Sequence, residues 1–145
     1  MKKKILIVDD DPYMCRILRA HFELLGYDSF LAVNGKEAVE MATSQLPILI
    51  VMDIMLPVMD GLQATRLIRK NRKTKSTPIL AITARATLKD QEDCIQSGCN
   101  DFIAKPYTSK QLTASIEKLL GQNSNPTTFP PKLSSLLSGL SSSNA

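Results

Sequence analysis

The stretch "KILIVDDDP", residues 4–12, joins an apolar run to three consecutive carboxylates near the start of the chain. A run of Ile, Leu and Val bounded by polar residues is typical of a buried strand in a parallel sheet. Asp9, Asp10 and Asp11 follow this run directly, and unpaired carboxylates at one strand end repel each other. We therefore expect a cation to lie beside them.

Four more apolar runs follow along the chain, and amphipathic stretches separate them. Several of these stretches begin as helices do: Asp11 precedes Pro12, and Asn34, Thr87 and Thr108 each precede an acid or amide by three residues. The expected strands are Lys4–Val8, Ser29–Val33, Ile48–Met52, Pro78–Thr83 and Asp101–Ala104. This alternation predicts an α/β fold, a doubly wound parallel sheet of five strands with helices on both faces.

The chain of 145 residues has room for one ordinary domain that folds without disulfides. Its three cysteines match no zinc pattern, and no stretch resembles a signal peptide or a membrane-spanning helix. We therefore expect a cytoplasmic protein without membrane insertion. Near residue 120 the composition shifts to Ser, Asn and Pro, which predicts a folded domain over residues 1–120 and a linker or disordered tail over residues 121–145. "KLSSLLSGL" in that tail could form a short docking helix.

The net charge of +4 includes one dense basic cluster, distant in sequence from the acidic run. Such a cluster is typical of the solvated face and end of a helix, where cations interact favourably with the C-terminal dipole. We therefore expect no direct binding of nucleic acid. The cluster consists of Arg66, Arg69, Lys70, Arg72, Lys73 and Lys75.

Polar side chains lie at the carboxyl ends of the expected strands, where sheets of this kind bind ligands. Asp9 and Asp10 follow the first strand, Asp53 the third and Lys105 the fifth, while Thr83 closes the fourth. Three carboxylates near one point suit a hard divalent cation, and Mg2+ combines one or two direct carboxylates with water or phosphate oxygens. The sequence therefore predicts a Mg2+ site at this edge of the sheet.

Asp53 is the carboxylate best suited to attack a phosphoryl group, a reaction in which an aspartate becomes an acyl phosphate. It ends "ILIVMD", the most continuously apolar stretch, which we expect in the middle of the sheet. The Lys105 ammonium group can pair with one phosphoryl oxygen and the Thr83 hydroxyl can bind another. These residues predict a phosphoryl acceptor.

Four stretches resemble the receiver domain of two-component response regulators, the fold of the chemotaxis receiver. They are "ILIVDDDP", "ILIVMDIMLPVMDG", "PILAITARA" and "GCNDFIAKPYT", and the resemblance covers residues 3–120. It implies a flavodoxin-like sheet with strand order 2-1-3-4-5. It also implies that Asp53 receives its phosphoryl group from a histidine kinase or a histidine phosphotransfer protein. The module would be no enzyme, because it assists only its own phosphorylation and dephosphorylation.

The resemblance also implies roles for individual residues around Asp53. Asp10 resembles a direct Mg2+ ligand, Asp9 a ligand acting mainly through water, and Met55 a ligand through its backbone carbonyl. Lys105 resembles the phosphate-binding lysine, and the Lys105-Pro106 bond matches one that is usually cis in the family.

Two further residues, Thr83 and Phe102, fall at the switch positions of the family. On phosphorylation we expect Thr83 to shift toward the phosphate and Phe102 to favour an inward rotamer. This would alter the surface formed by the fourth helix, the strand Asp101–Ala104 and the fifth helix, where an unknown protein target would bind.

The lifetime of the phosphoryl group should depend on residues 55 and 85, which the resemblance places beside the path of the hydrolytic water. Here they are Met55 and Arg85. Neither side chain can take a proton from water, and both are large. We therefore expect slow self-dephosphorylation, unless both side chains point to solvent and have little effect.

Other functions and simpler roles compete with this interpretation. A Mg2+-dependent phosphohydrolase usually has a second acid two residues after its nucleophile, where this chain has Met55. A nucleotide-binding module would have a glycine-rich phosphate loop, whereas the first loop is "DDDPYM". Asp11 is expected to cap a helix, and Phe102 could be an ordinary core residue. The chain would be either a complete receiver or the amino-terminal part of a longer protein.

Overall fold

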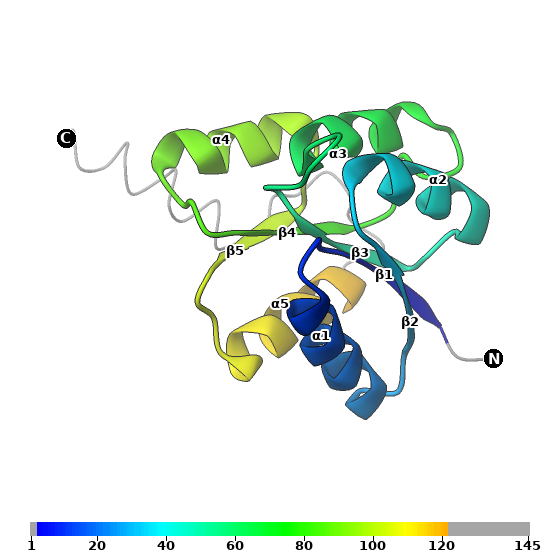
Figure 1. Cartoon of the computed structure of the whole chain (residues 1–145), viewed down its shortest axis with the longest axis vertical. Helices are drawn as coiled ribbons and strands as arrows, with labels where there is room; N and C mark the ends of the chain where they lie inside the picture. The colour runs from blue at the N-terminus through cyan, green and yellow to red at the C-terminus, as the bar shows by residue number, and fades with distance from the viewer. Residues whose placement is uncertain (1–2, 122–145) are drawn as a thin grey trace.

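The computed structural model describes residues 3–121, which form a parallel sheet of five strands and five helices (Figure 1). The strands lie in the order β2-β1-β3-β4-β5, so the predicted flavodoxin-like topology is confirmed. The strands are β1 (Lys4–Val8), β2 (Asp28–Ala32), β3 (Leu49–Asp53), β4 (Ile79–Thr83) and β5 (Asp101–Ala104). The helices are α1 (Pro12–Leu24), α2 (Gly35–Gln45), α3 (Gly61–Lys70), α4 (Leu88–Ser97) and α5 (Ser109–Gly121). Apart from Gly121, the expected tail over residues 121–145 lies outside the described residues.

The sheet separates two hydrophobic clusters, one on each face. Figure 1 shows α1 and α5 on one face and α2, α3 and α4 on the other. Successive strand residues point to opposite faces, so in β1 Ile5 and Ile7 pack with α1 and α5, while Leu6 and Val8 pack with α2, α3 and α4. All four of these side chains are at most 1% exposed. Burial on both faces explains why the central strands are continuous apolar runs instead of alternating with polar residues.

The predicted helix starts are largely observed. The Asp11 carboxylate caps α1 by accepting from the Tyr13 amide at 3.0 Å. Thr87 and Thr108 each form a reciprocal capping box with the side chain three residues later, as predicted. These side chains bond backbone amides at the helix starts that would otherwise lack a partner. They therefore fix where the loops from the carboxyl edge of the sheet end and the helices begin.

Three of the five predicted strands differ from the observed ones at their ends. β2 stops before Val33 because the Val33 amide donates to the Glu37 carboxylate. β3 extends to Asp53, whose register partner is Ile82 of β4. β4 begins after Pro78, which has no amide hydrogen to donate.

Gly61 sets how closely α3 approaches the end of β3. Its amide donates to the Ile54 carbonyl at 2.9 Å, and a Cβ atom at this position would lie 2.6 Å from the Asp53 carbonyl oxygen. A side chain there would push the start of α3 away from the strand end. Glycine therefore keeps the β3–α3 connection tight against Asp53.

The basic cluster was predicted to lie on a solvated helix face. Arg69 does not fit this prediction, because its side chain is partly buried. It donates to the Gly98 carbonyl at 2.9 Å, the Thr77 carbonyl at 2.7 Å and the Asn100 side chain at 2.8 Å. These bonds tie α3 to the connections before β4 and before β5. The exposed members of the cluster are Arg66, Lys70, Arg72, Lys73 and Lys75.

Within residues 3–121, none of the helices combines the length and the apolar character that crossing a membrane requires.

Candidate functional site

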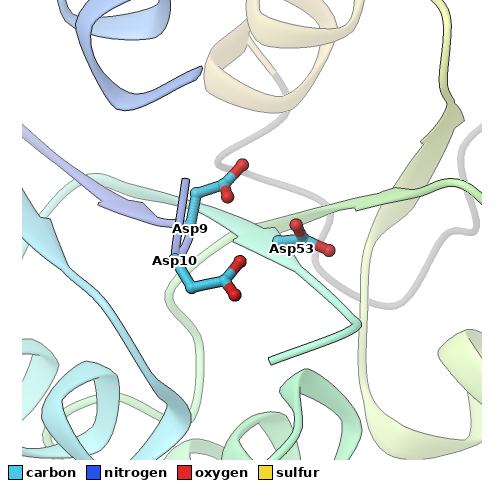
Figure 2. A group of neighbouring side chains, drawn as sticks. All are labelled: Asp9, Asp10 and Asp53. Atoms are coloured by element: carbon cyan, nitrogen blue, oxygen red, sulfur yellow. The ribbon is translucent and has the colours of Figure 1, made fainter. Parts of the chain in front are cut away.

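Three carboxylates from two neighbouring strands meet at the carboxyl edge of the sheet (Figure 2). Asp9 and Asp10 follow the end of β1, and Asp53 is the last residue of the adjacent β3. Each carboxylate offers an oxygen, and these oxygens all lie within 4.8 Å of one another. Hard oxygen donors at this spacing fit Mg2+, and the exposure of Asp10 leaves room for the water ligands that Mg2+ retains.

The electrostatics of the cluster also favour a bound cation. Asp9 is only 3% exposed, and burial raises the pKa of its carboxyl group, with further increases from the charges of Asp53 and Asp10. A hydrogen bond of 2.9 Å from the Asp11 amide and the charge of Lys105 oppose this rise. A divalent cation would offset the remaining repulsion between the acids.

Lys105 reaches this cluster from the end of β5. Its Nζ atom lies 3.1 Å from Oδ2 of Asp53 and 3.8 Å from Oδ2 of Asp9, and the Lys105-Pro106 bond is cis. Oδ1 of Asp53 accepts from the Met55 amide at 3.0 Å. Asp53 is 6% exposed. Because each of its carboxylate oxygens has a partner, the orientation of the carboxylate is fixed.

The Thr83 hydroxyl is engaged with the backbone of the next loop. It donates to the Arg85 carbonyl at 2.8 Å and accepts from the Arg85 amide at 3.0 Å. The structure thus places Thr83 at the predicted edge of the sheet, with its hydroxyl bonded to Arg85. A shift toward a phosphoryl group would exchange the bond to the Arg85 carbonyl for one to phosphate.

The structure places the Phe102 ring in the core, where it is 3% exposed and belongs to the same cluster as Ala81, Cys94 and Cys99. Sequence analysis treated this residue as a switch whose ring becomes inward on phosphorylation. Its location agrees with the simpler possibility of a core phenylalanine. The switch role of Phe102 stays a prediction.

Met55 and Arg85 border a pocket of about 560 Å3 next to the site, which Thr83 also lines. Met55 is 51% exposed, and the Arg85 guanidinium lies 3.9 Å from the Asp90 carboxylate. Both side chains therefore border a pocket that Thr83, at the carboxyl edge of the sheet, also lines.

One residue of this region, Tyr107, was not singled out by sequence analysis. Its hydroxyl oxygen is buried and has no hydrogen-bond partner among the described residues. Burial raises its pKa, and the negative charges of Asp9 and Asp53 raise it further. The sequence feature that could have pointed to Tyr107 is its position directly after Lys105 and Pro106 in "GCNDFIAKPYT".

The sheet order and the convergence of acids, hydroxyl and lysine at one edge define the class of receiver domains. The family described as "Response regulator receiver domain" matches residues 5–117, and the chain belongs to this family.

Curated relatives agree with this assignment. The polar-differentiation response regulator DivK of Brucella anthropi is 34% identical over 121 residues, which cover 83% of this chain and 98% of DivK. The dual master transcriptional regulator RpaA of Synechocystis is 33% identical over 117 residues, covering 81% of this chain and 48% of RpaA. This chain thus spans about half the length of RpaA and of several other curated relatives that it matches.

Solved structures give the same fold. The receiver domain of the sensor histidine kinase PA1611 from Pseudomonas aeruginosa, solved with a magnesium ion in its active-site cleft, has a TM-score of 0.78 and 38% identity. The match covers 84% of this chain and 100% of that one. The chemotaxis protein CheY4 of Vibrio cholerae has a TM-score of 0.78 and 25% identity, with 83% and 100% of the two chains covered.

Proposed function

We propose that Asp53 accepts a phosphoryl group in a Mg2+-dependent reaction from a phosphohistidine of a histidine kinase or a histidine phosphotransfer protein. The observation that carries this proposal is the meeting of three carboxylates within 4.8 Å with the Lys105 ammonium group 3.1 Å from Asp53. Acids of this kind could bind a cation alone, but the lysine supplies a second, fixed partner for a phosphoryl oxygen.

In the proposed reaction an Asp53 carboxylate oxygen attacks phosphorus and the bond from phosphorus to the donor nitrogen breaks. The imidazole of the donor keeps the electron pair and leaves as a neutral ring after taking up a proton. Asp9, Asp10, Asp53 and the Met55 carbonyl would hold Mg2+, which when bound neutralises charge on the phosphoryl oxygens. Lys105 can then pair with the transferred group, since its ammonium group already lies against Asp53.

The proposed role is that of a phosphoacceptor that assists only its own phosphorylation and dephosphorylation. A phosphohydrolase acting through an aspartyl phosphate would need a group to activate water beside the site. The side chains that border the adjacent pocket at residues 55 and 85 are Met and Arg, and neither serves as a general base. The acyl phosphate should therefore accumulate.

We propose residues 1–120 as the receiver and residues 121–145 as a linker or tail outside the described residues. The output would be a change in the α4–β5–α5 surface that binds a protein target, without direct contact to nucleic acid and without membrane insertion. A cytoplasmic location fits transfer from a kinase domain.

The test is the intact mass of the purified protein after incubation with acetyl phosphate and Mg2+. The parent and the control Asp28→Asn, which alters an exposed acid at the other end of the sheet, should each gain one phosphoryl group. Asp53→Asn should gain none, and omission of Mg2+ should prevent the gain in every variant. A phosphorylated Asp53→Asn protein would contradict the proposal, as would acetyl phosphate turnover without any phosphoprotein.

A further inference from the structure

Two cysteines, Cys94 and Cys99, flank the turn that ends α4. Gly98 takes a left-handed conformation with φ of 112°, and the Cys99 amide donates to the Cys94 carbonyl at 3.0 Å. Gly98 also donates to the Cys94 carbonyl. This six-residue pattern at a helix end brings the side chains of its first and last residues into contact. Here both of those side chains are thiols.

The two thiols share one buried environment. Cys94 is 2% exposed and Cys99 is 4% exposed, and both belong to the cluster between the sheet and α2, α3 and α4. They interact directly with each other, and the Thr65 hydroxyl lies 3.8 Å from the Cys99 sulfur. A disulfide requires two Cβ atoms about 3.5–4.5 Å apart. The backbone hydrogen bond of 3.0 Å across the turn draws the two residues toward each other.

The surroundings make Cys99 the more acidic of the pair. Contact with Cys94 lowers the pKa of Cys99, burial opposes this change, and the Thr65 hydroxyl and the Arg69 cation lower the pKa further. Contact with Cys99 and burial both raise the pKa of Cys94. The Arg69 Nε donates to the Gly98 carbonyl at 2.9 Å, so this cation is fixed beside the turn. The thiolate is the nucleophile in thiol oxidation, which assigns the first step to Cys99.

The third cysteine, Cys15, offers an internal comparison. It lies in the opposite cluster, is 3% exposed, and its sulfur lies 3.3 Å from the Asp9 carbonyl. Cys15 is thus as buried as the pair but has no cysteine beside it.

We propose that Cys94 and Cys99 are a redox-active pair that a small hydroperoxide converts into an intramolecular disulfide. The Cys99 thiolate attacks the terminal peroxide oxygen, the O–O bond breaks, and the departing alkoxide or hydroxide takes up a proton, which leaves a sulfenic acid. The Cys94 thiol then attacks the Cys99 sulfur, forms the S–S bond and releases water. Two electrons pass from the thiols to the peroxide, and a dithiol reductant reverses the change.

Access for a small oxidant comes from the pocket beside the site. Cys94 lines that pocket of about 560 Å3 together with Thr83 and Arg85, whereas Cys99 does not line it. The oxidant would therefore reach the Cys99 sulfur past Cys94. The crosslink would fasten the last turn of α4 to the start of β5. Redox state would therefore change the stiffness of one part of the α4–β5–α5 surface, independently of whether Asp53 is phosphorylated.

The experiment treats the folded protein with hydrogen peroxide, alkylates remaining thiols in denaturant, and maps tryptic peptides by mass. Cys94 and Cys99 share the peptide of residues 90–110, whereas Cys15 lies in the peptide of residues 5–16. We expect the first peptide to lose two hydrogens at least about tenfold faster than Cys15 becomes oxidised and so resists alkylation. Dithiothreitol should restore the two hydrogens. Amide hydrogen exchange at Gly98 and Cys99 should be slower in the oxidised protein.

Two variants separate the steps. Cys94→Ala should stop at a sulfenic acid on Cys99 that dimedone captures, whereas Cys99→Ala should leave Cys94 reduced. Should either variant fail to fold, the parent comparison of the two peptides decides alone. Oxidation of Cys15 at the same rate, disulfides between chains, or a 90–110 peptide that gains oxygen without forming a disulfide would each overturn the proposal.

Discussion

The Nζ atom of Lys105 lies 3.1 Å from Oδ2 of Asp53, although the two residues are 52 positions apart in the sequence. The contact joins the end of β5 to the end of the central strand β3, across β4. We expect Lys105→Gln to slow phosphorylation of Asp53 by about tenfold or more, because a fixed charge beside the phosphoryl oxygen is lost. Phosphorylation rates by intact mass measure this effect. Lys110→Gln, at an exposed lysine, is the control, and equal rates in both variants would remove Lys105 from the site.

Thr83 should affect the response of the protein to phosphorylation. Its hydroxyl bonds the Arg85 backbone, at 2.8 Å to the carbonyl, so movement toward a phosphoryl group would pull the β4–α4 loop with it. In Thr83→Ala we expect the phosphorylated and unphosphorylated amide spectra to differ only around Asp53, while Thr83→Ser should keep shifts that extend into α4. Shifts in α4 that persist in Thr83→Ala would assign the coupling to other residues.

Self-dephosphorylation should be slow in the parent protein. Met55 and Arg85 border the pocket beside Thr83, and neither can orient water by accepting its proton. The double variant Met55→Asn with Arg85→Glu should lose phosphate about tenfold faster or more in excess Mg2+. Time courses of intact mass give both rates. A parent that already hydrolyses as fast as the double variant would show that these side chains do not control the reaction.

Arg69 should contribute more to stability than any simple surface cation. Its guanidinium group donates to three separate acceptors at 2.9 Å or less. A lysine ammonium group cannot reproduce this planar arrangement of N–H donors. We expect Arg69→Lys to lower the free energy of unfolding by about 2 kcal/mol. Arg66→Lys, at an exposed position on the same helix, should change it by less than about 0.5 kcal/mol. Urea unfolding distinguishes the two, and equal effects would refute the structural role.

His21 should make stability fall on acidification. Its ring nitrogen lies 3.0 Å from the Thr113 hydroxyl, and burial lowers its pKa below the ordinary value of 6.5. The unfolded chain then binds the proton more readily than the folded one, so the free energy of unfolding decreases as pH falls through and below 6.5. The slope from one such group is at most about 1.4 kcal/mol per pH unit. Urea titrations of the parent and His21→Gln between neutral and mildly acidic pH should differ in slope, and identical slopes would contradict this assignment.

The sheet and the edge that carries the site were predictable because each strand is an apolar run followed by a polar residue. Asp53 and Lys105 could be placed at one edge from parallel topology alone. The burial of Phe102, the fork of Arg69 and the bond from Thr83 to the Arg85 carbonyl depend on side-chain directions and loop geometry that no local pattern encodes. The β2 boundary differed because the Val33 amide bonds Glu37 at 3.0 Å instead of continuing the ladder.

The most direct test of the central claim is to locate the acyl phosphate chemically. Borohydride reduces an aspartyl phosphate to homoserine, and Asp53 lies in the tryptic peptide of residues 37–66, apart from Asp9, Asp10 and His21. After treatment with acetyl phosphate, Mg2+ and borohydride, we predict homoserine at position 53 and unchanged Asp9 and Asp10. Homoserine at another aspartate, or a phosphorylated protein in which Asp53 resists reduction, would contradict the account.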